Sequence, residues 1–281
     1  MGKGKAKKGR GAPTMAELAD RHVLYQKSVQ DPAAEIEFLD EKFSRLRGRR
    51  PMRLREDFCG TALLATAWAR SHPRRTAVAV DLDRETLEWG RRHNVEAGGP
   101  ELARRVELIE ADVLEVETAP VDVLCAFNFS YYIFQERERL LAYLRRARGA
   151  LAPGGILVMD CYGGTESGTT GEEEREVDGF AYVWEQAEFN PISHRGTCYI
   201  HFRFPDGSEL PRAFSYHWRM WSLPELRELL DEAGFAAVHV YWEEFEEGEP
   251  GDEYLVGTGR YREVVEVENQ ESWIAYLIAE A

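Results

Sequence analysis

Glu56 and Asp81, which each end an expected strand, are the residues of this sequence best placed to do chemistry. Glu56 precedes the tight turn Cys59-Gly60-Thr61, which opens an expected helix. Backbone N–H groups at such a turn can hold an anionic group. Asp81 ends the next strand, where an acid can accept hydrogen bonds from both hydroxyls of a ribose. The arrangement therefore predicts a site for a nucleoside-containing cofactor.

The turn disfavours a nicotinamide or flavin dinucleotide, because those cofactors need G-x-G-x-x-G for close approach of the backbone to a pyrophosphate. The corresponding positions carry Phe58, Gly60 and Ala62, and the Phe58 side chain would crowd a diphosphate. No G-x-x-x-x-G-K-[ST] occurs, which removes the usual triphosphate-binding loop. Glu56 instead suits a cofactor with a positively charged end, such as an amino-acid moiety.

Five motifs, in order and with ordinary spacing, resemble the class I S-adenosylmethionine-dependent methyltransferase family. The resemblance covers roughly residues 50 to 162, and more weakly Trp221 to Tyr241. The motifs are Glu56 to Ala62, with two of the family's three loop glycines replaced; Val80-Asp81, the ribose-binding strand end; Glu110 to Val113, whose acid reaches the adenine amino group; Asp122 to Tyr132, the fourth strand and the loop that faces the methyl group; and Leu151 to Asp160, the turn into strand five.

The resemblance implies S-adenosyl-L-methionine as cofactor and S-adenosyl-L-homocysteine as product. The cofactor-binding residues it implies are Tyr25, Glu56, Cys59, Gly60, Asp81, Leu82, Asp112, Val113, Asn128 and Ser130. Tyr25 could lie against the cofactor or belong to an ordinary helix-capping turn. The candidates for action on the acceptor are Tyr131, Tyr162 and His217, although we expect Tyr131 or Tyr132 to pack under the following helix. Four cysteines without a C-x-x-C pair predict neither a metal site nor a disulfide framework.

Methyl transfer from a sulfonium needs a lone pair and in-line alignment, and a base only when the acceptor is an alcohol, a phenol or a protonated amine. The loop Asn128 to Tyr132 superficially resembles the Asn-Pro-Pro-Tyr loop of enzymes that methylate bases or glutamine, but both prolines are absent. We therefore expect transfer to nitrogen or oxygen of a small-molecule acceptor. The alternatives are a protein or nucleic-acid methyltransferase, and a non-catalytic cofactor-binding or interaction protein of the same fold.

Charge and hydropathy restrict the partners. The net charge of −15 disfavours binding to duplex nucleic acid, although Lys3, Lys5, Lys7, Lys8 and Arg10 form a basic tail that could contact nucleic acid or an acidic partner. There is no run of 18 apolar residues and no apolar signal core, so we expect a cytoplasmic protein without membrane contact. Edge strands in the expected insertion make a homodimer or homotetramer reasonable.

The predicted fold class is α/β: a doubly wound, Rossmann-like methyltransferase sheet, mostly parallel with an antiparallel last strand, plus an antiparallel β insertion after strand five. The expected segments are a disordered tail (1–14), a helical cofactor lid broken near Asp31-Pro32 (15–50), the cofactor-binding core (51–160), the insertion as substrate cover or oligomer contact (161–221), and the C-terminal part of the core (222–281).

Two segments carry more detailed expectations. The insertion should start with a flexible link (161–171) and continue with strands at 180–189, 197–204 and 213–221. The C-terminal part should start with a helix capped by Ser222 and Glu225, followed by two antiparallel strands at 236–245 and 272–279. The acids at 243–253 should form a solvated loop between those strands, because consecutive acids repel one another.

Overall fold

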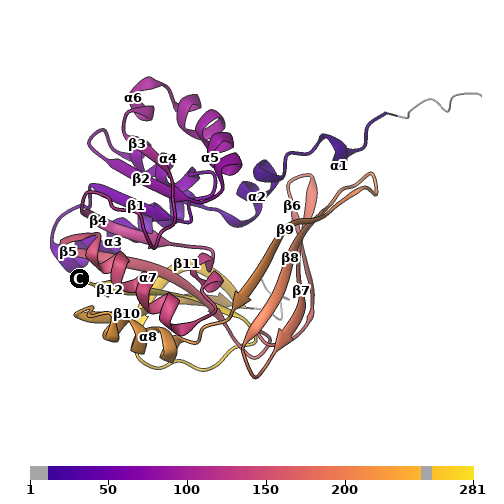
Figure 1. Ribbon diagram of the computed structural model, residues 1–281. Helices are drawn as coiled ribbons and strands as arrows, with labels where there is room; N and C mark the ends of the chain where they lie inside the picture. Colours follow the sequence, from indigo (N-terminus) through magenta and orange to yellow (C-terminus); the bar gives the residue numbers. More distant parts are fainter. Residues whose placement is uncertain (1–11, 248–254) are drawn as a thin grey trace, which may run out of the picture. The chain divides into compact units, whose positions relative to one another are not determined.

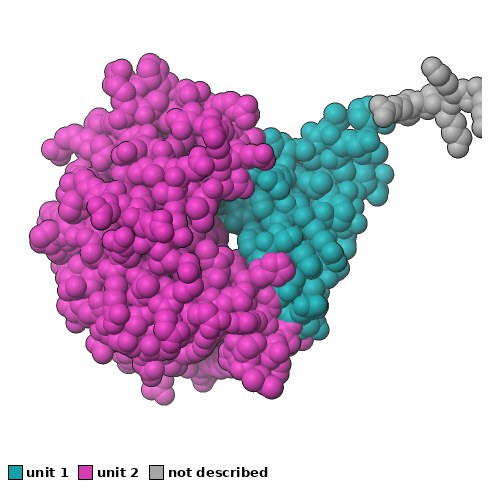
Figure 2. Space-filling model, viewed as in Figure 1, with its two compact units in different colours: residues 1–30, 170–188, 197–216 teal, residues 31–169, 189–196, 217–281 magenta. Residues whose placement is uncertain are grey.

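The computed structural model describes residues 12–247 and 255–281, which group into two compact units (Figures 1 and 2). The larger unit contains residues 31–169, 189–196 and 217–281, and the smaller unit contains the described part of 1–30 with 170–188 and 197–216. Most of the expected disordered tail and part of the expected acidic loop lie outside the described residues. Within the described ranges, no helix combines the length and apolar character needed to cross a membrane.

An eight-stranded sheet in the order β11-β10-β12-β5-β4-β1-β2-β3 forms the centre of the larger unit (Figure 1). The five strands from β3 to β5 in this order run parallel, and the other three pair antiparallel, which confirms the predicted fold class. The strands are β1 (Arg53–Asp57), β2 (Thr76–Asp81), β3 (Val106–Glu110), β4 (Val121–Ala126), β5 (Leu151–Gly163), β10 (Ala237–Glu247), β11 (Leu255–Val264) and β12 (Trp273–Glu280).

The C-terminal part contains three strands, so the prediction of two strands joined by an acidic loop was wrong. Glu244 and Glu246 belong to β10, where Arg260 of β11 lies 3.7 Å and 3.8 Å from their carboxylates. These cross-strand ion pairs oppose the repulsion between the acids. Strand β11 was missed because Gly257 and Gly259 replace side chains that would have shown the alternation of a strand.

Helices cover both faces of the sheet. The two expected helix starts are confirmed: the Asp31 side chain accepts from the Ala34 N–H (3.1 Å), and Ser222 and Glu225 cap each other reciprocally. Side chains of α3, α4 and α5 share one apolar core with the sheet. The helices of this unit are α3 (Pro32–Arg47), α4 (Leu63–Ser71), α5 (Arg84–Gly90), α6 (Pro100–Ala103), α7 (Arg137–Gly149) and α8 (Leu223–Glu232), with short turns η1 (Arg91–Val95), η2 (Glu96–Gly98) and η3 (Ser130–Ile133).

The smaller unit combines a four-stranded sheet, in the order β6-β7-β8-β9, with two N-terminal helices. Leu24 of α2 packs into an apolar cluster with Phe180, Ile200, Phe202 and Phe204 of this unit. The elements are α1 (Met15–Leu18), α2 (Arg21–Val29), β6 (Gly171–Val177), β7 (Phe180–Asn190), β8 (Arg195–Arg203) and β9 (Glu209–Arg219), the last of which continues into the larger unit. Residues 15–50 therefore divide between the units, rather than forming one segment.

Strand β6 was not predicted. It follows the expected flexible link, which is shorter than expected because β5 continues to Gly163. The strand could not be recognised in the sequence because glutamate has a low β-propensity, and four of its residues are glutamates: Glu172, Glu173, Glu174 and Glu176. In the folded chain Arg203 of β8 forms ion pairs with Glu172 (2.9 Å) and with Glu174. These ion pairs join residues that are far apart in the sequence, so local patterns could not reveal the strand.

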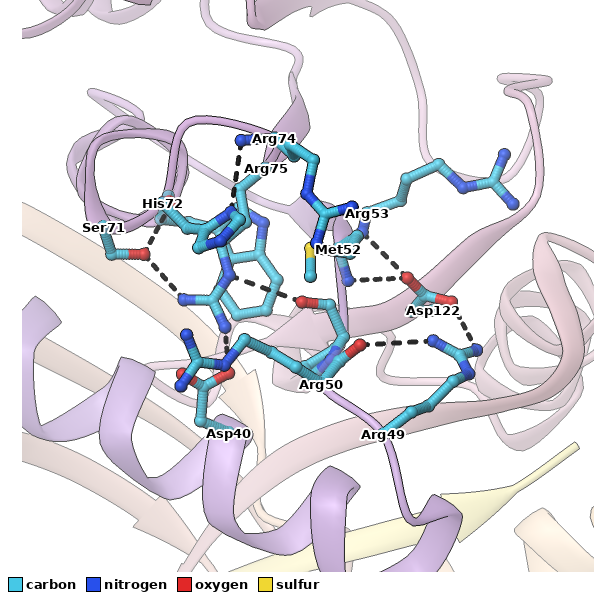
Figure 3. A network of polar contacts seen from close by, with 12 residues as sticks. Asp40, Arg49, Arg50, Met52, Arg53, Ser71, His72, Arg74, Arg75 and Asp122 are labelled. Carbon is cyan, nitrogen blue, oxygen red and sulfur yellow. Dashed lines mark hydrogen bonds and ion pairs between the residues drawn. The ribbon is translucent and has the colours of Figure 1, made fainter.

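A polar network lies where β1 and β4 begin (Figure 3). The carboxylate of Asp122, at the start of β4, accepts from Arg49 Nη2 (2.8 Å) and from the backbone N–H groups of Met52 (2.7 Å) and Arg53 (2.9 Å). Burial opposes ionisation of Asp122, but these hydrogen bonds outweigh it and lower the pKa of the carboxyl. One side chain thus ties the segment before β1 to the neighbouring strand.

We expect Asp122→Ala to lower the free energy of unfolding by about 2 kcal/mol at pH 7, because it leaves an arginine and two backbone donors without their acceptor. Urea unfolding measures the loss, and Glu107→Ala, an exposed acid on β3, is the control. A lowered carboxyl pKa stabilises the fold above the unfolded value of about 4 and no longer does so as pH falls through the folded value. The advantage of the wild type over Asp122→Asn should therefore shrink below about pH 4. A constant difference down to acid-induced unfolding would contradict this account.

Candidate functional site

The ends of β1 and β4 mark the point where the sheet reverses its strand order. From β1 the chain continues outward to β2 and β3, and from β4 it continues outward to β5 on the other side. Ligands of open α/β sheets bind outside the carboxyl ends of the strands at such a switch point. The residues predicted for the cofactor site on β1, β2 and β4 therefore meet at one edge of the sheet.

Three acids lie on the same face at this edge. Alternation along each strand puts Glu56 in line with buried Leu54, Asp81 in line with buried Ala79, and Asp160 in line with Val158. Leu54, Ala79 and Val158 all belong to the apolar core that α3 and α4 cover, so the carboxyls of Glu56, Asp81 and Asp160 lie at the end of that core.

The turn after β1 keeps a glycine-like backbone although two of its expected glycines are missing. Phe58 and Ala62 adopt φ values of 58° and 53°, in the left-handed region that glycine occupies most readily. The Phe58 ring packs against Phe134 and Tyr143, with centroid distances of 6.0 Å and 5.5 Å. The loop therefore accommodates both replacements without loss of its fold.

Gly90 of α5 holds this turn from behind. A Cβ atom at position 90 would lie 2.2 Å from the Thr61 carbonyl oxygen, closer than any real contact. The side-chain amide of Asn94 also donates to this oxygen (2.8 Å). Only a glycine allows α5 to approach the turn so closely. Within the turn, the Gly60 N–H donates to the Asp81 carboxylate (2.7 Å).

Glu56 is buried, and its Oε2 accepts from the Ala65 N–H (2.9 Å). Burial raises the pKa of Glu56 well above its usual range; the Ala65 hydrogen bond opposes this, and the nearby carboxyls of Glu35 and Asp81 add to it. A cation bound beside Glu56 would restore its ionised form, since an opposite charge favours the charged state.

Asp81, Leu82 and Asp112 form the adjoining part of the edge. The Asp81 carboxylate accepts from the Gly60 N–H (2.7 Å) and from the Asp83 N–H (2.9 Å). The Leu82 side chain is 64% exposed, which leaves an apolar surface beside the acid. Asp112 Oδ1 accepts from the Leu114 N–H (2.9 Å), and the Val113 side chain is buried. Acceptor groups and an apolar surface of this kind suit a nucleoside.

The loop after β4 is held by Asp160. Asn128 and Phe129 have left-handed φ values of 56° and 55°, and their N–H groups donate to the Asp160 carboxylate (2.7 Å and 2.9 Å). Ser130 Oγ donates to the Phe127 carbonyl (2.8 Å). Burial raises the pKa of Asp160 to about 7, although the two N–H donors oppose it. The strained loop therefore depends on an acid that the sequence places on another strand.

The structure gives Tyr131 a structural role, which corrects its prediction as a catalytic residue. Its side chain has no exposed surface, and its hydroxyl donates to the Asp160 carbonyl (2.6 Å). Tyr132 is equally buried and donates to the Tyr162 carbonyl (3.2 Å). Both tyrosines are therefore buried, whereas the packing of one of them under the following helix stays a prediction.

The remaining predicted residues lie in different places. The Tyr162 ring lies 5.9 Å from that of Phe129, whereas His217 is exposed and its carbonyl accepts from Gln135 Nε2 (2.8 Å). Tyr25 belongs to the smaller unit, where its ring packs 4.8 Å from that of Phe214. Cys59 is buried in the turn, and burial raises the pKa of its thiol well above the usual range.

Sequence reasoning missed Glu35, which lies in the first turn of α3. It shares a helical face with the buried residues Phe38, Leu39 and Lys42, so an acid stands where the pattern requires an apolar residue. Burial first, then the carboxyls of Asp160 and Asp31, raise the pKa of Glu35 to about 8. An acid on the apolar face of a helix was the signal that could have identified it.

The comparisons with known proteins agree with this geometry. A family model described as a methyltransferase domain matches residues 58–155. The chain is 29% identical over 120 residues to a cypemycin N-terminal methyltransferase of Streptomyces sp; the match covers 42% of this chain and 45% of that protein, so it spans less than half of the relative.

Solved structures show the same fold at 16% identity. An S-adenosylmethionine-dependent methyltransferase from Clostridium acetobutylicum ATCC 824 has a TM-score of 0.64, with 92% of this chain and 96% of that chain covered. An amino pentose methyltransferase from Micromonospora echinaspora, solved with S-adenosylmethionine bound, has a TM-score of 0.62 (92% and 95% covered). A sugar N-methyltransferase from Streptoalloteichus sp ATCC 53650 has a TM-score of 0.60 (100% and 98% covered).

We expect Gly90→Ala to destabilise the protein by about 2 kcal/mol, because the new Cβ must displace the Thr61 backbone. Gly149→Ala in α7 is the matched control: its Cβ meets nothing within 4 Å, and alanine should leave stability unchanged or raise it by up to about 1 kcal/mol. Urea unfolding of both variants measures the difference. Equal stability of the two would show that the turn and α5 are not tightly coupled.

Proposed function

This chain carries a methyltransferase domain of the class I S-adenosylmethionine-dependent family, and from that premise we propose that the protein methylates a nitrogen or oxygen of a small-molecule acceptor. The observation that carries the proposal is the row of acids at the switch point, of which Asp81 suits a ribose and Glu56 suits a positively charged amino-acid end. The similar proteins include one described as a sugar N-methyltransferase, one described as an amino pentose methyltransferase and one described as a cypemycin N-terminal methyltransferase, which supports a small acceptor.

The cofactor supplies an activated methyl group, and the chain's own residues would bind and orient it. Asp81 would accept from the ribose hydroxyls, Leu82 would cover the adenine ring, and Asp112 would accept from the adenine amino group. The turn after β1 would lie beside the amino-acid end, with Glu56 facing its positive charge. Asn128 and Ser130, on the loop held by Asp160, would lie beside the transferred methyl group.

The alternative of a non-catalytic protein loses its main argument. It rested on the missing glycines, yet Phe58 and Ala62 retain the left-handed backbone that those glycines would provide. The role of the insertion at residues 161–221 as substrate cover or oligomer contact stays a prediction. Several predictions remain as they were made. They are the roles of Tyr162 and His217 beside the acceptor, the role of Tyr25 and residues 15–50 as a cofactor lid, the homodimer or homotetramer, and the cytoplasmic location.

Asp81→Ala tests the cofactor assignment. Loss of charge-assisted hydrogen bonds worth roughly 1.5–3 kcal/mol each should weaken S-adenosylhomocysteine binding at least tenfold. Calorimetric titration measures the affinity, and thermal unfolding shows whether the fold persists. Glu88→Ala, an exposed acid on α5, removes the same charge as a control. Unchanged affinity in a folded Asp81→Ala variant would exclude Asp81 as the ribose acceptor.

Asp112→Asn separates binding from structure at the adenine. The amide oxygen can still accept from the Leu114 N–H, so the unfolding temperature of the free protein should change little. The new NH2 group offers a donor where the adenine amino group needs an acceptor, so affinity for S-adenosylhomocysteine should fall several-fold. A destabilised variant with unaltered affinity would instead make Asp112 a purely structural residue.

A further inference from the structure

A second group of acidic and aromatic side chains continues the edge beyond Glu56, on the β4–β5 side of the switch point. Asp160 of β5 lies opposite Tyr276 of β12 in the antiparallel register, and Glu35 of α3 interacts electrostatically with Asp160 and with Glu56. The adenosine-side residues Asp81 and Asp112 follow β2 and β3, on the other side of β1. The two groups therefore occupy opposite halves of the same edge.

Tyr276, which lies opposite Asp160, packs among other aromatic rings. The Tyr276 ring lies 4.5 Å from the ring of Phe38, 4.8 Å from that of Tyr261 and 5.7 Å from that of Phe127. The face of an aromatic ring attracts a cation and shields that cation from water. Carboxyls together with neighbouring aromatic rings form the chemistry that recognises an ammonium ion.

The negative charge in this group is not balanced by the protein. In the described part of the chain, no hydrogen bond or ion pair joins the Glu35 carboxyl. Its side chain keeps some exposed surface, yet burial is the largest cause of its raised pKa, as for a carboxyl enclosed by protein but still reachable. Lys42, two turns further along the same helix face, is engaged with Glu41 and the Tyr261 carbonyl (2.9 Å and 2.8 Å).

We propose that the methyl acceptor is an amine, which binds as its ammonium ion between Glu35 and Asp160, and that Glu35 takes the ammonium proton. The proposal rests on the proposed function, because it places the amine beside the methyl group that the cofactor supplies. A hydroxyl acceptor fits this place poorly, since developing alkoxide charge would be repelled by both carboxyls.

Protons and electrons balance in this scheme. On binding, the ammonium ion displaces the proton of Glu35 to solvent, and the carboxylate then accepts a proton from the ammonium. The freed nitrogen lone pair forms the N–C bond as the C–S bond breaks, and the electron pair of that bond stays on sulfur. The product leaves as a methylated ammonium ion, and Glu35 keeps the transferred proton.

The test uses two ligands that differ at the methyl position and does not require the acceptor to be known. In sinefungin, a carbon that bears a primary amine replaces the methylated sulfur, whereas S-adenosylhomocysteine has a neutral sulfur there. We compare their calorimetric affinities at pH 7 in wild type, in Glu35→Gln and in Glu37→Gln, an exposed acid on the same helix. Titrations in buffers of different ionisation enthalpy count the protons released.

We expect wild type and Glu37→Gln to bind sinefungin about tenfold more tightly than S-adenosylhomocysteine, with release of up to one proton. Glu35→Gln should lose most of this preference and the proton release, while its affinity for S-adenosylhomocysteine stays within about threefold. Raising the pH above the amine's own pKa should abolish the preference in wild type. Asp160, Glu56, Asp31 and the Tyr276 hydroxyl also face Glu35, so the Glu35→Gln comparison isolates its contribution.

Two results would overturn the proposal. An undiminished sinefungin preference in Glu35→Gln would show that Glu35 does not face the methyl position. A parallel loss of affinity for both ligands would place Glu35 at the amino-acid end of the cofactor. If wild type binds neither ligand, the proposed function itself fails, and this inference fails with it.

Discussion

Unbalanced negative charge at the carboxyl edge of the sheet is the constraint on which the rest of the structure depends. Glu35, Glu56, Asp81 and Asp160 lie there, and burial raises the pKa of each above its ordinary value. Removing a carboxylate from water without a cation is costly, so burial disfavours the charged forms of these groups until an opposite charge arrives. Such an arrangement destabilises the protein alone and is accounted for by what it binds.

The opposite edge of the same sheet shows that the chain can balance its acids. There Asp122 is paired with Arg49, and Asp40 contacts Arg75, whose guanidinium also lies over the Trp68 ring (3.9 Å). Arginine supplies planar donors at a fixed charge, so these acids are paired within the protein and have a structural role. Pairing with arginine at one edge, and its absence among the described residues at the other, distinguishes acids that stabilise the fold from acids that could bind a ligand.

Backbone strain gathers at the same edge as the charge. Phe58 and Ala62 after β1, and Asn128 and Phe129 after β4, all have positive φ. Conformations of this kind persist only where their surroundings hold them. Gly90 allows the first loop to be supported from behind, and Asp160 anchors the second through two N–H groups. Asp160 therefore joins the two constraints, because it holds the strained loop and contributes to the negative charge.

These tertiary relations mark the limit of what the sequence could predict. The mostly parallel α/β sheet and the helix starts at Asp31 and Ser222 follow from local patterns, and the structure agrees with them. Strands β6 and β11 could not be predicted from local patterns, because acids in β6 and glycines in β11 are uncommon in strands. Arginines on neighbouring strands, which are far away in the sequence, form ion pairs with the acids. Glu35 escaped notice because an isolated acid gives no motif, and its meaning appears only when α3 brings it to Asp160 and Glu56.

The position of the acids also gives a direction to the charge movement in the proposed reaction. Methyl transfer to an amine removes positive charge from sulfur, near Glu56, and creates it on nitrogen, near Glu35 and Asp160. Preorganised groups stabilise a transition state when they face the place where charge develops. Carboxyls already held beside the nitrogen need no reorganisation during the reaction, since α3 and the β4 loop fix them beforehand. The same unbalanced charge that weakens the free protein would therefore lower the barrier for an amine and raise it for an alcohol.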